Sequence, residues 1–242
     1  MRPYTRSLHP DDYQFLEPWN TPLTHFQQEM ARQQIPHREW HPHRFWEYSS
    51  VLQQLAELQV PEGAQILDVG SGGCFFAPYL AIFYPNLALT DSMKYGDISY
   101  MIQAQRMAYG VDLPLYDLLV EDMRPKPEVG WEGTSNSYDV TMCISTIEHV
   151  DVDQHDNAMH EICRITKPNG LIFITSDYFR DLGQFERSPS RHLQFTPYRK
   201  EFVLDLPNRF PVEFVGDTDL NYCGDFIHGA YSFVNICLRK VS

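Results

Sequence analysis

The stretch that decides the fold is Gln65–Phe76, which reads QILDVGSGGCFF. Its apolar run predicts a short buried strand that contains Asp68 near its end, and Gly70–Gly73 then lets the backbone turn sharply and approach a ligand closely. Phe75–Phe83 predicts a helix with Pro78 in its first turn, where a missing N–H is tolerated. A strand, a glycine turn and a helix N-terminus together indicate a nucleotide site, because free N–H groups point outward there.

The composition is ordinary for a globular chain that can bury a large core: 242 residues, 43% hydrophobic and 21% charged. A net charge of -13 argues against nucleic acid, since no basic surplus replaces the counterions of a phosphate backbone. The five cysteines lack CxxC spacing, which predicts reduced thiols and no metal centre. We see no signal peptide and no apolar run of membrane length, and therefore expect a cytoplasmic protein without a membrane partner.

The N-terminal part has a different character from the rest. Residues 1–43 show little periodicity and predict an arm. From Arg44 the apolar residues fall at helical spacing until Pro61-Glu62-Gly63 stops the helix before the central strand. We therefore expect residues 1–60 to form a lid of arm and helix, and residues 61–242 to form the main domain.

Three histidines lie close together in this arm. His37 and His41 are four residues apart and His43 follows, but prolines flank them and Glu39 does not complete an H-E-x-x-H motif. We interpret them as structural or surface histidines and not as metal ligands.

Strands and helices alternate through the middle of the chain. Strands are predicted at residues 86–90, 115–120, 138–144 and 171–175, helices at 98–109 and 153–166, and a turn at 167–170. This alternation is typical of a parallel sheet covered by helices.

Asp91 ends the second of the predicted strands and lies 23 residues after Asp68 (91 − 68 = 23). That spacing is close to the interval of about 20 at which an acid binds the ribose hydroxyls of a nucleotide. The alternative is a helix cap or an acid in a solvated turn.

The C-terminal part breaks the alternation. Residues 177–193 predict a long functional loop, and Thr196-Pro197 predicts the start of a helix that reaches about Leu206. Two strands near residues 212–215 and 232–238 have no helix between them, which predicts an antiparallel pair at a sheet edge.

Three segments, ILDVGSGGCF at 66–75, CISTIEHV at 143–150 and ICRITKPNGLIFI at 162–174, carry a family resemblance. In this order they resemble the motifs of class I S-adenosylmethionine-dependent methyltransferases, a broad family that modifies small molecules and glycans. The match covers about residues 61–178, and Cys74 stands where the family commonly has a third glycine. The resemblance implies an α/β, Rossmann-like, doubly wound sheet of seven mostly parallel strands, with an antiparallel last strand and an N-terminal helical arm.

The resemblance also implies a cofactor and the residues that hold it. The cofactor is S-adenosyl-L-methionine and the product S-adenosyl-L-homocysteine. Asp68 is expected near the amino-acid end, Asp91 at the ribose and Asp122 at the adenine edge. Trp46 enters on a physical argument, because aromatic rings on the helix before the first strand could cover a sulfonium by cation–π contact; the alternative is an ordinary core position. The expected cofactor-binding residues are Trp46, Asp68, Gly70, Ser71, Gly72, Asp91, Ser92, Asp122, Met123 and Ser145.

For catalysis, His149 is the first candidate for a base that removes the acceptor's proton, since it follows the fourth strand and has a suitable ordinary pKa. The alternative is that Glu148 and His149 cap a helix or fix a loop. His192 is the second candidate.

We expect methyl transfer to an oxygen or nitrogen of a small or medium-sized acceptor such as a metabolite, natural product or sugar. Two alternatives remain, a non-catalytic cofactor-binding scaffold and an NAD-dependent oxidoreductase, although the dinucleotide motif would need glycine or alanine where Phe75 stands.

Overall fold

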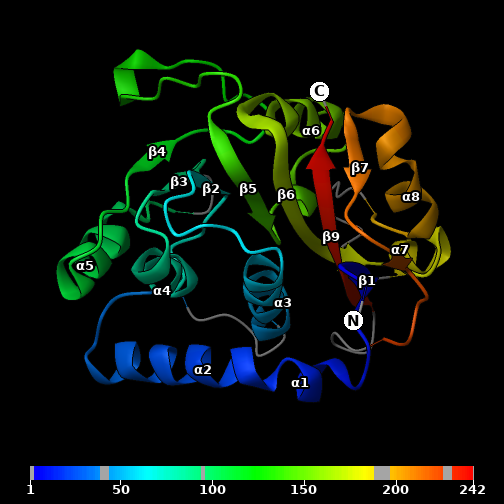
Figure 1. The fold of residues 1–242 in the computed structure, drawn as a ribbon, viewed down its shortest axis with the longest axis horizontal. Coiled ribbons are helices and arrows are strands. Elements are labelled where there is room, and N and C mark those ends of the chain that lie inside the picture. Colours follow the sequence, from blue (N-terminus) through cyan, green and yellow to red (C-terminus); the bar gives the residue numbers. More distant parts are fainter. Residues whose placement is uncertain (1–2, 39–43, 94–95, 188–196, 226–230, 242) are drawn as a thin grey trace.

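The computed structural model describes residues 3–38, 44–93, 96–187, 197–225 and 231–241. These residues contain a nine-stranded sheet in the order β4-β3-β2-β5-β6-β9-β1-β8, with β7 also paired to β9 (Figure 1). The strands are β1 (Thr5–Ser7), β2 (Ile66–Val69), β3 (Leu87–Asp91), β4 (Leu115–Asp117), β5 (Tyr138–Ile144), β6 (Thr166–Tyr178), β7 (Val212–Phe214), β8 (Thr218–Asp219) and β9 (Ser232–Lys240). The helices are α1 (Asp12–Phe15), α2 (Glu17–Arg32), α3 (Arg44–Glu57), α4 (Phe76–Phe83), α5 (Ser99–Tyr109), α6 (His155–Ile165), α7 (Leu182–Arg187) and α8 (Lys200–Arg209), with short 3-10 turns η1 (Pro127–Val129) and η2 (Ile147–His149).

Two apolar layers cover the sheet, because successive strand residues point to opposite faces. In β2, Ile66 packs in the layer formed with α3, α4 and α5, whereas Leu67 packs in the layer formed with α6 and α8. In β5, Met142 and Cys143 divide between the layers in the same way. Both faces of the central strands are therefore buried, as expected for a helix-covered parallel sheet.

The predicted fold is confirmed. The strands β4, β3, β2, β5 and β6 are parallel to their neighbours, and β9 runs antiparallel to β6. With β7 they make up the seven predicted strands, and β1 and β8 are short additions. β7 and β9 form the predicted antiparallel pair. However, β9 is not at the sheet edge among the described strands, because β1 also pairs with it.

Several predicted boundaries were wrong. β4 ends at Asp117, three residues before the predicted end. Residues 167–170 belong to β6 and form an irregularity there, with Asn169 at a φ of 64° and a register shift opposite β5. α8 begins at Lys200, because Tyr198 is held in an extended conformation by its bridge to Tyr178 at the end of β6.

The remaining C-terminal predictions fall partly outside the described residues. The predicted loop at 177–193 begins as the end of β6 and continues into α7, and residues 188–196, including Thr196, lie outside the described part of the chain. His41 and His43 of the histidine cluster also lie outside it, while the His37 ring contacts the Ile35 carbonyl at 2.8 Å.

The N-terminal arm contains more structure than its sequence pattern predicts. β1 pairs with β9 on one side and β8 on the other, and the Tyr4 carbonyl next to it accepts from the side chains of Gln54 and Asn235 at 3.0 and 2.6 Å. α2 lies alongside α3 and α4 and contacts both (Figure 1). In the part of the chain that the structure describes, we find no helix with the length and apolar character needed to cross a membrane.

Candidate active site

A cavity of about 490 Å³ opens at the carboxyl ends of β2, β3 and β5, where ligands of such sheets bind. It receives residues from the glycine turn, from the ends of three strands and from the arm. The residues that line it are Arg38, Arg44, Tyr48, Gly70, Ser71, Gly72, Asp91, Ser92, Leu119, Val120, Glu121, Ile144, Ser145, Thr146, His149, Val150 and Asp151.

The glycine turn after β2 forms the floor of this cavity. Gly70 has a φ of 73°, and a Cβ there would lie 2.2 Å from Cγ2 of Thr146. Gly72 also has a positive φ, of 67°. The Ser71 hydroxyl is buried and has no hydrogen-bond partner among the described residues, although its residue lines the cavity. A tightly curved backbone and an unsatisfied donor fit the polar amino-acid end of the implied cofactor.

Asp91 stands beside this turn at the end of β3. The N–H groups of Gly72 and Met93 donate to its two carboxylate oxygens at 2.9 and 3.0 Å. These bonds fix the carboxylate against the cavity wall, and each oxygen keeps a further acceptor site. The side chain can therefore accept from a pair of ribose hydroxyls.

Asp68 lies behind the turn and does not line the cavity. Its residue is 3% exposed, and burial, followed by the charge of Asp91, raises its pKa from 3.8 to about 7. Asp68 is therefore poised to change its charge near neutral pH.

The wall next to the glycine turn follows β5, and the Thr146 hydroxyl donates to the Gly70 carbonyl at 2.9 Å. Ser145 has a φ of 49°; its N–H donates to the Thr175 carbonyl and hydroxyl at 3.0 Å each, and its hydroxyl donates to Glu148 Oε1 at 2.9 Å. Glu148 is almost completely buried, which raises its pKa. His149 is in η2 and lines the cavity, whereas its neighbour Glu148 is buried and does not line it.

Arg44 brings a positive charge to the same cavity from α3. Its Nη1 lies 3.0 Å from Glu47 Oε2, and the Thr175 hydroxyl donates to Glu47 Oε1. Burial lowers the Arg44 pKa, but the Glu47 and Glu148 carboxylates outweigh burial and raise it. Burial raises the pKa of Glu47 to about 7 and that of Asp177 well above its ordinary value. Arg44 is therefore a fixed cation next to a group of buried carboxyls that readily hold protons.

Trp46 does not line the cavity. Its Nε1 donates to Asp12 Oδ2 at 3.1 Å, and its ring stacks on Phe233 with centroids 6.3 Å apart. Tyr48 lines the cavity instead, because residues two apart on a helix lie on nearly opposite faces. Arg44 and Tyr48 are four residues apart and therefore lie on the same face of α3, which lines the cavity. This spacing could have identified both as cavity residues from the sequence.

Asp122 and Met123 also lie outside the lining. Asp122 forms ion pairs with Arg124 and Lys126 at 2.7 and 3.5 Å, and Met123 is fully buried. Residues 119–121 line the cavity in their place, since β4 ends early and the turn comes sooner than predicted.

Of the other predicted residues, Gly70, Ser71, Gly72, Asp91, Ser92, Ser145 and His149 meet at the cavity, and His192 lies outside the described residues. Arg38 was missed. Its N–H donates to the Gly73 carbonyl at 3.1 Å, which brings the arm onto the glycine turn. No periodic pattern surrounds it, so its sequence gave no signal.

Comparisons with known proteins agree with this geometry. Residues 67–174 match the family model described as a methyltransferase domain. The chain resembles the crystal structure of the [4+2]-cyclase SpnF (16% identity, TM-score 0.62, covering 97% of each chain). It also resembles the N-methyltransferase NodS from Bradyrhizobium japonicum in complex with S-adenosylhomocysteine (12% identity, TM-score 0.59, covering 96% of this chain and 100% of that one).

A third similar structure is 1,6-didemethyltoxoflavin-N1-methyltransferase from Burkholderia thailandensis with 1,6-didemethyltoxoflavin and S-adenosylhomocysteine (13% identity, TM-score 0.57, covering 97% of this chain and 92% of that one). No curated protein matches the sequence. At these identities the structural likeness shows the fold alone. Residues 67–174 match a methyltransferase domain, and the chain therefore has the fold of methyltransferase structures that hold S-adenosylhomocysteine.

Proposed function

We propose that this chain transfers a methyl group to an oxygen or nitrogen of a small or medium-sized acceptor such as a metabolite, natural product or sugar. The observation that carries the proposal is the cavity of about 490 Å³, which the glycine turn, Asp91 and His149 all face. Its volume lies in the range of sites for small molecules. Two structures of the same fold carry S-adenosylhomocysteine and are described as N-methyltransferases, which supports nitrogen as one of the two acceptor atoms.

The cofactor roles follow from the positions around the cavity. We assign the amino-acid end to the glycine turn, with the Ser71 hydroxyl as a donor and the Asp68 carboxylate as the charge behind it. Asp91 is assigned to the ribose. Residues 119–121 are assigned to the adenine, with Asp122 and Met123 supporting them from outside the cavity. Trp46 supports α3 and not the cofactor directly, because its indole bonds to Asp12.

S-adenosylmethionine supplies a methyl group that is already activated on a sulfonium, so the chain must align the acceptor and exclude water. We assign His149 the removal of the acceptor's proton, with an imidazole nitrogen as the proton-accepting atom. Ser145 and Glu148 hold the backbone that carries it, through their 2.9 Å hydrogen bond. His192 stays a second candidate for the same role.

We propose that residues 1–60 act as a lid over the cofactor. Three observations support this function. The Arg38 N–H bonds to the glycine turn, the Gln105 side chain donates to the Pro36 carbonyl at 3.1 Å, and Arg44 and Tyr48 line the cavity. Deletion of residues 1–43 should therefore weaken cofactor binding or turnover. A truncated chain with full affinity and full activity would refute the lid.

Two measurements test the proposed function. Calorimetry with S-adenosylhomocysteine and with NAD comes first, and we expect binding of the former alone. Incubation with S-adenosylmethionine labelled in its methyl group, and with a pool of small amines and alcohols, comes second, and we expect label in a small product. Binding without transfer to any acceptor would favour the scaffold alternative, and transfer to RNA or DNA alone would overturn the acceptor class.

A further inference from the structure

The wall assigned to the adenine is the tight turn of residues 119–121, which makes no strand pairing with the described strands of the sheet. Its pairing with β3 ends with the bond from the Leu118 N–H to the Asp91 carbonyl at 3.0 Å. The Asp122 N–H then donates to the Leu119 carbonyl at 3.1 Å, which closes a turn whose residues 119–121 face the cavity. The position of this wall therefore depends on what holds the chain directly after the turn.

The residue directly after the turn is Met123, and side chains hold both of its backbone polar groups. Its N–H donates to Glu161 Oε2 at 2.9 Å. Its carbonyl accepts from Arg164 Nη2 at 2.8 Å and from Trp131 Nε1 at 2.9 Å. Since the Met123 side chain is also fully buried, this residue cannot shift without breaking several contacts together.

Glu161 and Arg164 are themselves fixed to each other and to the fold. Arg164 donates from Nε to Glu161 Oε1 at 2.8 Å and from Nη2 to Oε2 at 2.9 Å, a bidentate pair three residues apart on α6. The Arg164 side chain is 26% exposed and the Glu161 side chain is 15% exposed. Their neighbours Ile162 and Ile165 are buried in the layer beneath the sheet, so the pair stands on a rigid element.

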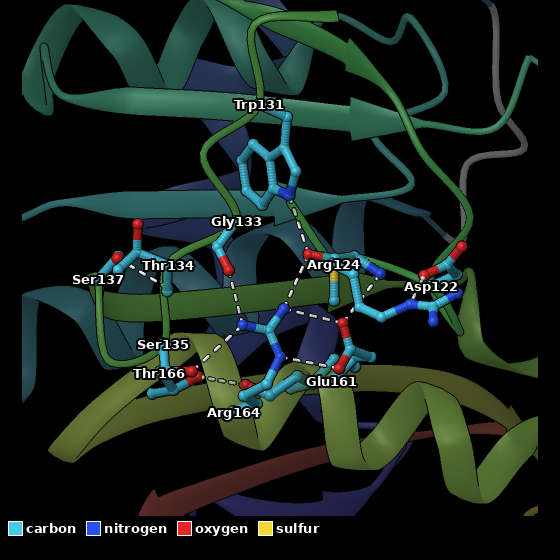
Figure 2. Close-up of polar contacts among 12 residues, drawn as sticks. Asp122, Arg124, Trp131, Gly133, Thr134, Ser135, Ser137, Glu161, Arg164 and Thr166 are labelled. Atoms are coloured by element: carbon cyan, nitrogen blue, oxygen red, sulfur yellow. Dashed lines mark hydrogen bonds and ion pairs between the residues drawn. The ribbon is translucent and has the colours of Figure 1, made fainter. Parts of the chain in front are cut away.

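Arg164 also reaches the far end of the same loop. Its Nη1 donates to the Gly133 carbonyl at 2.7 Å and lies 3.3 Å from the Ser135 hydroxyl (Figure 2). One guanidinium thus joins both ends of residues 123–133 to α6.

We propose that Glu161 and Arg164 are positioning residues for the adenine-binding wall. Neither lines the cavity; they act through the Met123 backbone, which sets where residues 119–121 stand. This inference rests on the proposed function, because it assumes that an adenine nucleoside occupies the cavity. It predicts that loss of the pair weakens every ligand that contains adenine by the same factor.

The test compares two ligands in three proteins. S-adenosylhomocysteine and 5′-methylthioadenosine share the adenine, and the second lacks the amino-acid end. Calorimetry on the wild type, Arg164→Met and Asp156→Asn gives six dissociation constants. Asp156→Asn is the matched control, because it breaks another ion pair of α6, with Arg209, that does not reach the loop.

We expect Arg164→Met to weaken both ligands equally, by roughly 10- to 100-fold, the effect of one lost hydrogen bond to a charged group. Asp156→Asn should leave both constants unchanged. Hydrogen exchange should also quicken at residues 118–123 in Arg164→Met alone. Trp131→Phe, which keeps the ring and removes one donor to Met123, should give a smaller loss of roughly 2- to 5-fold and serves if Arg164→Met does not fold.

A lower melting temperature with unchanged dissociation constants would overturn the proposal, because a merely structural pair changes stability and not affinity. A loss confined to S-adenosylhomocysteine would overturn it as well, since the adenine is common to both ligands. A wild type that binds neither ligand would instead refute the proposed function.

Discussion

Asp68 should make cofactor binding depend on pH. The residue is 3% exposed, and its carboxyl carries a pKa raised to about 7 by burial and by the charge of Asp91. The buried thiols of Cys74 and Cys143 also lie in its electrostatic range and are uncharged near neutral pH, since burial raises their pKa values. The cofactor's amino group is a cation, so its binding favours the ionised carboxylate and should release a proton whenever Asp68 starts protonated.

The size of the effect follows from this pKa. Below about pH 7 each pH unit should cost up to tenfold in affinity, so binding of S-adenosylhomocysteine should weaken roughly 30-fold between about pH 8 and about pH 5.5. The effect on stability has the opposite sign. The folded carboxyl binds its proton more tightly than the unfolded one, so its contribution is present below about pH 4 and is lost as the pH rises through 7. Asp68→Asn should therefore stabilise the ligand-free protein at about pH 8, by at most about 4 kcal/mol.

Calorimetry across this pH range, in buffers of different ionisation enthalpy, measures both the affinity and the protons released. Asp68→Asn should bind S-adenosylhomocysteine weakly and with no such slope. 5′-Methylthioadenosine lacks the amino group, and its affinity should not follow Asp68 in either protein. A flat profile in the wild type, or the same slope in Asp68→Asn, would refute the role given to this carboxyl.

Three further substitutions test the site. Gly70→Ala should destabilise the fold by about 2–4 kcal/mol in chemical denaturation, because its Cβ would meet Thr146, whereas Gly63→Ala, with no atom within 4 Å of its Cβ, should change stability little. Asp91→Ala should weaken S-adenosylhomocysteine by about 1.5–3 kcal/mol in calorimetry, the scale of a hydrogen bond to a charged group, and unchanged affinity would remove it from the ribose. His149→Ala should lower turnover by about 10²–10⁴-fold and leave cofactor affinity nearly unchanged; an equal loss of affinity would make it a binding residue.

The parallel core was predictable because each strand carries an unbroken apolar run and each connection a helical one. The helix α2 within the arm was not predicted, although Trp19, Leu23, Phe26 and Met30 follow the 4-3-4 spacing of a helix face and pack against the core. Pro18 and Pro22 lie in the first half of α2, and prolines at these positions argue against a helix in the sequence. β1 has three residues, and the described strands that pair with it lie more than 200 residues away, so no local pattern could reveal it.

The predicted residues that line the cavity are mostly those whose positions are fixed by backbone geometry. Glycines after a strand and an acid after the next one have few alternatives, and these residues meet at the cavity. At other positions, whether a residue lines the cavity depends on where a strand ends or on how a helix is rotated. The sequence pattern does not determine either of these closely enough. A shift of three residues at the end of β4 moved the cavity wall from Asp122 to residues 119–121, and two positions along α3 separate Trp46 from Tyr48.

The pairing of β1 with β9 also affects the order in which the protein can assemble. Leu8 and Leu16 pack with Trp46 against Phe233 of β9, so the arm has its full docking surface only after the last strand is in place. A ribosome makes the arm first, and it must then wait for more than 200 residues before its partners emerge. During translation the arm therefore cannot dock over the cofactor cavity until β9 has been made. The arm is synthesised first but reaches its final position last.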